Sequence, residues 1–107
     1  MALTRDFKLT IVERVEREPE FAKSLFDEAA SLFLNGEADV ARLILRDLVN
    51  ATIGFEKLAA QTQKPSKSLH RMLSPTGNPN MDNLAAIFNA LRTSLGLQIE
   101  VHAVSTP

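Results

Sequence analysis

The fold of this chain is decided by residues 58–73, which read Leu58-Ala59-Ala60-Gln61-Thr62-Gln63-Lys64-Pro65-Ser66-Lys67-Ser68-Leu69-His70-Arg71-Met72-Leu73. Two short helical patterns meet here at a turn, because Pro65 cannot continue the first helix but can open the second. Ala59 supplies the small residue that two helices need where they touch. The residues placed to anchor both helices to a core are Leu58, Leu69 and Met72. The stretch therefore predicts a helix-turn-helix.

The outward positions of the second helix carry short polar or cationic side chains. Such side chains bond phosphates and base edges of double-stranded DNA, and the free N–H groups at the start of the helix also favour phosphate. The simpler interpretation is a solvated helix face, and Ser66 and Ser68 could instead cap the helix. The candidate DNA-binding residues are Lys64, Ser66, Lys67, Ser68, His70 and Arg71.

The charge of the chain is unevenly distributed. Residues 1–52 hold seven Lys and Arg against ten Asp and Glu, whereas residues 53–107 hold five against three. Within residues 53–80 there are four cationic residues and a single acid, Glu56. A basic segment in a nearly neutral protein suits an anionic partner, and this one coincides with the predicted helix-turn-helix.

Composition excludes several classes of function. A length of 107 residues suits one domain, and 45% apolar with 23% charged residues is typical of globular proteins. There is no cysteine, so disulfides, thiol nucleophiles and cysteine zinc sites are excluded. His70 and His102 are too far apart in sequence to form a metal motif, and Glu20, Asp27 and Glu28 have no neighbouring histidine. We therefore expect no enzyme, no cofactor and no metal.

The rest of the chain is helical in pattern, which predicts an all-α fold. Pro19 opens a helix after Glu18, and Asn35-Gly36 ends it. The next helix is expected to turn Val40, Leu43, Ile44 and Leu48 inward. Helices are predicted at about residues 6–17, 19–34, 37–50, 55–62, 65–74 and 82–95.

A loop follows the predicted helix-turn-helix. Residues 75–80 contain two prolines, one glycine and two asparagines, a composition that no helix or strand accepts. The asparagines of this region are candidates for phosphate contacts, although turn formation and helix capping explain them nearly as well. These candidates are Asn78, Asn80 and Asn83.

The end of the chain has a different periodicity. Residues 97–104 alternate apolar and polar side chains, which predicts a short C-terminal β-strand. A lone strand cannot satisfy its own backbone, so it needs either the same strand from a second copy or the sheet edge of another protein. The side chains expected to face that partner are Leu97, Ile99, Val101 and Ala103.

Residues 38–97 resemble the lambda-repressor-like (Cro-type) DNA-binding domain. In that family a five-helix domain carries the helix-turn-helix on its second and third helices, followed by a loop and two closing helices. Residues 55–74 match the family's motif, and residues 78–91 look like its closing helix. Gln63 stands where the family commonly has glycine, so it must accept a left-handed or strained conformation at a cost of order 1 kcal/mol. Phe55 stands where a DNA-contacting glutamine is common and is better interpreted as core or interface.

The chain as a whole resembles a narrower group, the HigA-like addiction-module antidotes. The resemblance rests on Ser-Lys-Ser-Leu-His-Arg-Met-Leu-Ser-Pro-x-Gly-Asn-Pro, residues 66–79, and on Asn-Leu-Ala-Ala-Ile-Phe, residues 83–88. It implies a bacterial or phage-derived antitoxin that represses its own operon and neutralises a RelE-like toxin. A homodimer on a palindromic operator is expected as well, because a single repressor-like unit reads only a few base pairs. The alternatives are a protein-interaction module with little DNA binding and a phage-type repressor without a toxin.

The resemblance and the patterns together predict how the chain is organised. We expect an N-terminal helical extension over residues 1–36, a lambda-repressor-like domain over residues 37–97, and a C-terminal strand and tail over residues 98–107. No stretch approaches the ~20 apolar residues of a membrane span, and the N-terminus leads into charge rather than an apolar signal core. A cytoplasmic, nucleoid-associated protein with no membrane partner is therefore expected.

Overall fold

Six helices make up the computed structural model, which describes residues 2–107 and the side chains from Thr10 onward. In chain order they are α1 (Ala2–Arg17), α2 (Pro19–Leu34), α3 (Ala38–Ala51), α4 (Gly54–Thr62), α5 (Ser66–Met72) and α6 (Met81–Leu95). No strand forms within residues 2–107. The all-α class predicted from the sequence is therefore confirmed.

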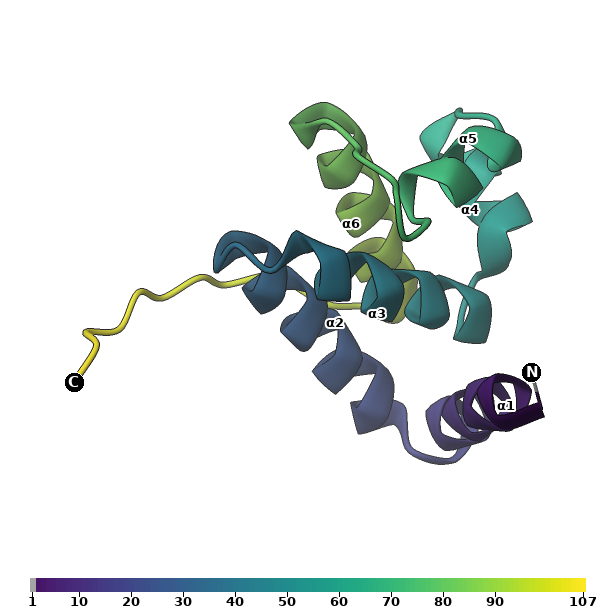
Figure 1. Ribbon diagram of the computed structural model, residues 1–107, viewed down its shortest axis with the longest axis horizontal. Coiled ribbons are helices and arrows are strands. Elements are labelled where there is room, and N and C mark those ends of the chain that lie inside the picture. Colours follow the sequence, from purple (N-terminus) through teal and green to yellow (C-terminus); the bar gives the residue numbers. More distant parts are fainter. Residues whose placement is uncertain (1) are drawn as a thin grey trace.

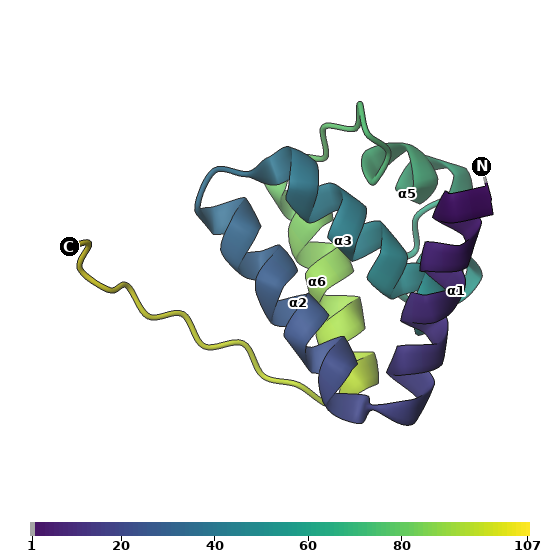
Figure 2. The ribbon, with the colours of Figure 1, turned by 60° about the horizontal axis from the view of Figure 1, so that its bottom comes forward.

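The helices are arranged around the pair α2 and α3. These two helices lie side by side, with α6 behind them and α1 across their end (Figure 2). Helix α4 contacts α3, α5 and α6, and α5 adds Leu69 to the same core, so both helices of the short pair α4–α5 are attached to the longer helices (Figure 1). The candidate site is therefore carried on one side of a larger helical body.

One hydrophobic core runs through α2 to α6. Helix α2 contributes Ala22, Phe26 and Ala29 to the same cluster as the other four helices. The ring of Phe88 in α6 meets Phe26 and Phe33 edge to face, with ring centroids 5.5 and 5.7 Å apart. Such pairs add to the area that they bury, so α2 is joined to α6 by aromatic packing as well as by apolar burial.

The ends of α2 follow from its sequence. Pro19 occupies the first turn, where its missing N–H costs no hydrogen bond, and Glu20 suits the positive end of the helix. At the other end, Gly36 adopts a φ of +87°, and the side chain of Asn35 donates to the carbonyl of Ser31. The predicted start and stop of this helix are confirmed.

The inward face of α3 agrees with the prediction only in part, since Leu48 is fully buried and Ile44 packs against the core. Val40 and Leu43 are 48% and 39% exposed, so the expectation that they face the core was wrong. The buried apolar positions are Ala41, Leu45, Leu48 and Val49. Each residue turns an α-helix by about 100°, so a stripe displaced by one position faces solvent. Arg42 takes a buried place beside this stripe, which the apolar pattern did not reveal.

The C-terminal strand predicted over residues 97–104 is not formed. Residues 97–107 leave α6 as an extended tail that projects from the body (Figures 1 and 2). The chain holds no other strand within residues 2–107, so the tail has no edge to pair with. Leu97 packs against the core, whereas Ile99, Val101 and Ala103 are exposed.

Candidate nucleic-acid interface

A tight turn joins α4 to α5. Gln63 adopts φ 56° and ψ 39°, which confirms the left-handed conformation that its position required. The N–H of Lys64 donates to the carbonyl of Ala59 at 3.2 Å, and the hydroxyl of Thr62 donates to the carbonyl of Leu58 at 2.8 Å. The first bond satisfies the carbonyl of Ala59, one of the last four that the end of a helix leaves without an intrahelical partner, and the second adds a side-chain donor within the last turn. The turn is therefore closed by the backbone and by one threonine.

Apolar side chains hold α4 and α5 on the core. Leu58 and Leu69 have no exposed surface, and Met72 packs partly buried against the same cluster. The predicted anchoring role of these three residues is confirmed. Leu73, which directly follows α5, is also fully buried. Phe55 is 5% exposed, as expected for a core residue rather than a DNA contact.

The outer face of α5 carries the cationic residues. Lys67, His70 and Arg71 are exposed, whereas Lys64, Ser66 and Ser68 are half-buried. Within residues 10–107, Lys64, Lys67 and Arg71 form no ion pair with a carboxylate. Helix α5 itself contains no acidic residue. The face therefore presents positive charge that the described part of the chain does not neutralise.

The start and end of α5 differ slightly from the expected bounds. Pro65 stands at the N-cap in an extended conformation, and the side chains of Ser66 and Ser68 make no hydrogen bond within the described part of the chain. The helix also ends at Met72 rather than at Ser74. The capping alternative for the two serines is therefore wrong.

His70 is stacked on Phe55 of α4. The two ring centroids are 3.8 Å apart and the ring planes differ by 19°. One face of the imidazole is thus covered while the residue as a whole stays exposed. The sequence offered no signal for this pair, since the two residues lie fifteen positions apart on different helices. The stack fixes the direction in which His70 can offer its ring nitrogens.

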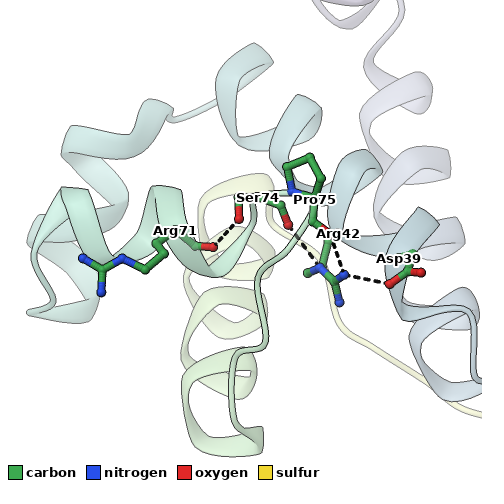
Figure 3. A network of polar contacts seen from close by, with 5 residues as sticks. All are labelled: Asp39, Arg42, Arg71, Ser74 and Pro75. Atoms are coloured by element: carbon green, nitrogen blue, oxygen red, sulfur yellow. Dashed lines mark hydrogen bonds and ion pairs between the residues drawn. The ribbon is translucent and has the colours of Figure 1, made fainter.

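The loop after α5 is tied to α3 by Arg42. The Nε of Arg42 donates to the carbonyl of Ser74 at 3.2 Å, and its Nη2 donates to the carbonyl of Pro75 at 3.1 Å and to the carboxylate of Asp39 at 2.7 Å (Figure 3). Arg42 is 7% exposed. Figure 3 shows the guanidinium of Arg71 extending away from this network, although its carbonyl accepts from the Ser74 hydroxyl at 2.8 Å.

Gly77 closes the same loop against the end of α5. Its N–H donates to the carbonyl of Ser74 at 3.0 Å. A Cβ at this position would collide with the backbone carbonyl oxygens of Arg71 and Met72, so no larger residue fits without movement of the loop. Glycine is needed here for close approach, and α5 is thereby backed by a loop in a defined position.

The three candidate asparagines have different surroundings. The side-chain oxygen of Asn80 accepts from the N–H of Asn83 at 2.8 Å and caps α6, as the capping alternative foresaw. Asn83 is half-buried in the first turn of α6, whereas Asn78 is exposed in the loop. The structure therefore assigns a structural role to Asn80 and leaves Asn78 the most accessible of the three.

Two other kinds of feature are absent from the described part of the chain. Among those residues no group of three or more His, Asp or Glu side chains lies close enough to hold a metal ion. No helix within residues 2–107 is both long and apolar enough to cross a membrane.

Comparisons of the chain with protein-family models, with curated proteins and with solved structures found no match in any of the three. A functional proposal for this protein accordingly depends on the residues and geometry described above.

Proposed function

We propose that the protein binds double-stranded DNA sequence-specifically through α4 and α5, which act as a helix-turn-helix. The observation that carries the proposal is the outer face of α5, where Lys67, His70 and Arg71 are exposed on a helix held from behind by Leu69 and Leu73. The major groove of DNA, about 12 Å wide, admits one α-helix. Helix α5 enters that groove with this face toward the bases.

The support of α5 favours this role. A reading helix must hold its side chains in a defined position, because base contacts depend on distance and angle. The closed turn at Gln63, the loop at Gly77 and the bonds from Arg42 restrain α5 at both ends. Ser66 and Ser68 are short enough to bond phosphate or a base edge beside the cations.

The biological role that follows is repression of transcription. We infer that α3 to α6 form a lambda-repressor-like domain and that the protein is an antitoxin of the bacterial cytoplasm that represses its own operon. Two copies related by a dyad read a palindromic operator with half-sites about 34 Å apart. No catalytic chemistry is assigned to the chain.

The proposal is tested with the DNA upstream of the protein's own gene and with palindromes selected from random DNA. Binding should weaken steeply as salt rises, since neutralised phosphates release counterions. Replacing Lys67 or Arg71 by Ala should cost about 1–3 kcal/mol where the side chain reads a base, and a uniform loss across sequences identifies a phosphate contact. Electrophoretic mobility shift and fluorescence anisotropy measure both effects.

The matched control is Lys23→Ala, which removes an exposed cation from α2, far along the chain from α5. This variant should bind the operator as the unchanged protein does. Normal binding by the double variant Lys67→Ala, Arg71→Ala would refute the assignment of α5. Binding that ignores both sequence and salt would refute the proposed function itself.

A second candidate is a protein-interaction module that neutralises a RelE-like toxin. The unpaired tail favours it, because an extended segment can add to the sheet edge of another protein. Co-purification with the product of the adjacent gene, with no selected DNA sequence and no effect of Arg71→Ala, would favour this candidate over the repressor.

A further inference from the structure

An apolar groove lies between α2 and α6. It has a volume of about 320 Å³, and nearly all of its lining is apolar. Leu34 and Met81 at its rim are 66% and 80% exposed, which is unusual for large apolar side chains. The remaining lining residues are Ala30, Phe33, Leu84, Ala85, Phe88 and Ile99. Contiguous apolar surface of this kind marks a site of interaction.

The tail begins at this groove and runs beside α2 as far as His102, where tail and helix line a second, more polar hollow. Ile99 lines the groove, whereas Val101 and Val104 beyond it are 67% and 86% exposed (Figure 2). Leu97 donates its N–H to the carbonyl of Arg92, but within the described chain no backbone hydrogen bond involves residues 98–107. The tail therefore exposes both apolar side chains and unpaired backbone groups beside an open apolar surface.

We propose that the groove between α2 and α6 receives the tail of a second copy of this chain, and that the exchange is reciprocal. The tails of the two copies lie antiparallel, which pairs the backbone groups that a single chain leaves open. Residues two apart share one face of an extended chain. The side chains of Val101 and Ile99 therefore point to the same side of the tail, and both can face an apolar groove. The proposal rests on the homodimer of the proposed function and specifies its contact.

A second copy fits the tail better than the chain's own groove does. Were the tail to fold back over its own α2 and α6, the backbone groups of residues 98–104 would lie against apolar side chains with no partner. An unpaired backbone group that is buried costs about as much as a lost hydrogen bond. A twofold pair gives hydrogen-bond partners to the groups along the facing edges of both tails, and because the contact is closed it does not extend into a filament.

The test uses two variants of the full-length chain at exposed positions. Leu34→Lys places a cation at the rim of the groove, and Val101→Asp places a carboxylate on the tail. Either change buries an unpaired charge at both contacts, so each variant alone should raise the dimer dissociation constant at least about tenfold. Analytical ultracentrifugation measures the dissociation constant, and circular dichroism should show unchanged helical content.

An equimolar mixture of the two variants should form the dimer again. In the mixed pair the new carboxylate meets the new ammonium at one contact, and the other contact keeps its original residues. The matched control is Leu43→Lys, which charges an exposed apolar position on α3 outside the groove and should leave dimerisation unchanged.

Several outcomes would overturn the proposal. An unaltered chain that stays monomeric at high concentration would mean that a second copy does not occupy the groove. Dissociation by Val101→Asp but not by Leu34→Lys would mean that the tails pair away from the groove. Failure of the mixture to recover would contradict the reciprocal contact. These measurements use no DNA, so they test the dimer contact even if the protein fails to bind an operator.

Discussion

Helix α5 and the C-terminal tail are both exposed segments with candidate contact residues, but they are supported differently. Helix α5 rests on Leu69 and Leu73, which have no exposed surface, and its following loop is bonded to Arg42. Of residues 97–107, only Leu97 packs against the core. The first segment is held by the core, whereas the second makes few contacts with it beyond Leu97.

This difference indicates how each segment can bind. A helix that is already restrained loses little conformational entropy on binding, which suits the reading of a fixed pattern of base edges. An extended tail loses more conformational entropy when it binds. New backbone hydrogen bonds and the burial of alternating apolar side chains would offset this loss. The following predictions test whether the two segments differ in this way.

The largest effect is expected at the anchor of α5. Leu69→Ala should lower the free energy of unfolding by about 2–5 kcal/mol, because it leaves a cavity in a fully buried site. Urea denaturation followed by circular dichroism gives this value. Lys67→Ala, on the exposed face of the same helix, should change stability by less than about 0.5 kcal/mol. Equal effects of the two changes would mean that α5 is not held by the core.

A smaller effect is expected at the bonds that hold the loop. Arg42→Met should cost about 1–3 kcal/mol, because the carbonyls of Ser74 and Pro75 lose their buried donor. Chemical denaturation measures the loss, and faster amide exchange at Gly77 should accompany it.

Arg46→Met is the matched control on the same helix. The Nε of Arg46 is buried without a hydrogen-bond partner, so this change removes no such bond and should cost less than about 0.5 kcal/mol. A larger loss for Arg46→Met than for Arg42→Met would contradict the restraining role of Arg42.

A gain in stability is expected at the turn. Gln63→Gly should raise the free energy of unfolding by up to about 1 kcal/mol, because glycine adopts the left-handed conformation without steric cost. Ala60→Gly, three residues earlier within α4, should instead lower it by about 1 kcal/mol. Thermal and urea unfolding measure both. A loss of stability in Gln63→Gly would mean that the glutamine side chain contributes more than its strained backbone costs.

The smallest effect is expected at the tail. Removal of residues 99–107 should change the stability of the monomer by less than about 0.5 kcal/mol, since little of this segment is buried. Removal from Leu97 onward should cost about 1 kcal/mol more, because Leu97 packs on the core and its N–H donates to the carbonyl of Arg92. Denaturation at low protein concentration makes this comparison. A large loss in the shorter truncation would show that the tail belongs to the fold of the single chain.

Local signals along the chain were enough to predict all six helices. These signals act over a few neighbouring residues, so they do not depend on tertiary contacts. They are the apolar spacing, Pro19, Gly36 and the loop composition of residues 75–80. The left-handed Gln63 and the buried Phe55 were also foreseen. On α3, Ile44 and Leu48 were predicted correctly and Val40 and Leu43 were not, because the choice between adjacent apolar positions depends on which helices pack against them.

The sequence by itself determined the helices, the turn at Gln63 and the cationic character of α5, because periodicity, backbone restriction and charge belong to short segments. Only the tertiary structure decided that Arg42 bonds the loop, that Gly77 admits no side chain, that His70 stacks on Phe55 and that α2 and α6 leave a groove between them. Each of these joins residues far apart in the chain, and their separation and direction exist only after packing has brought the helices together.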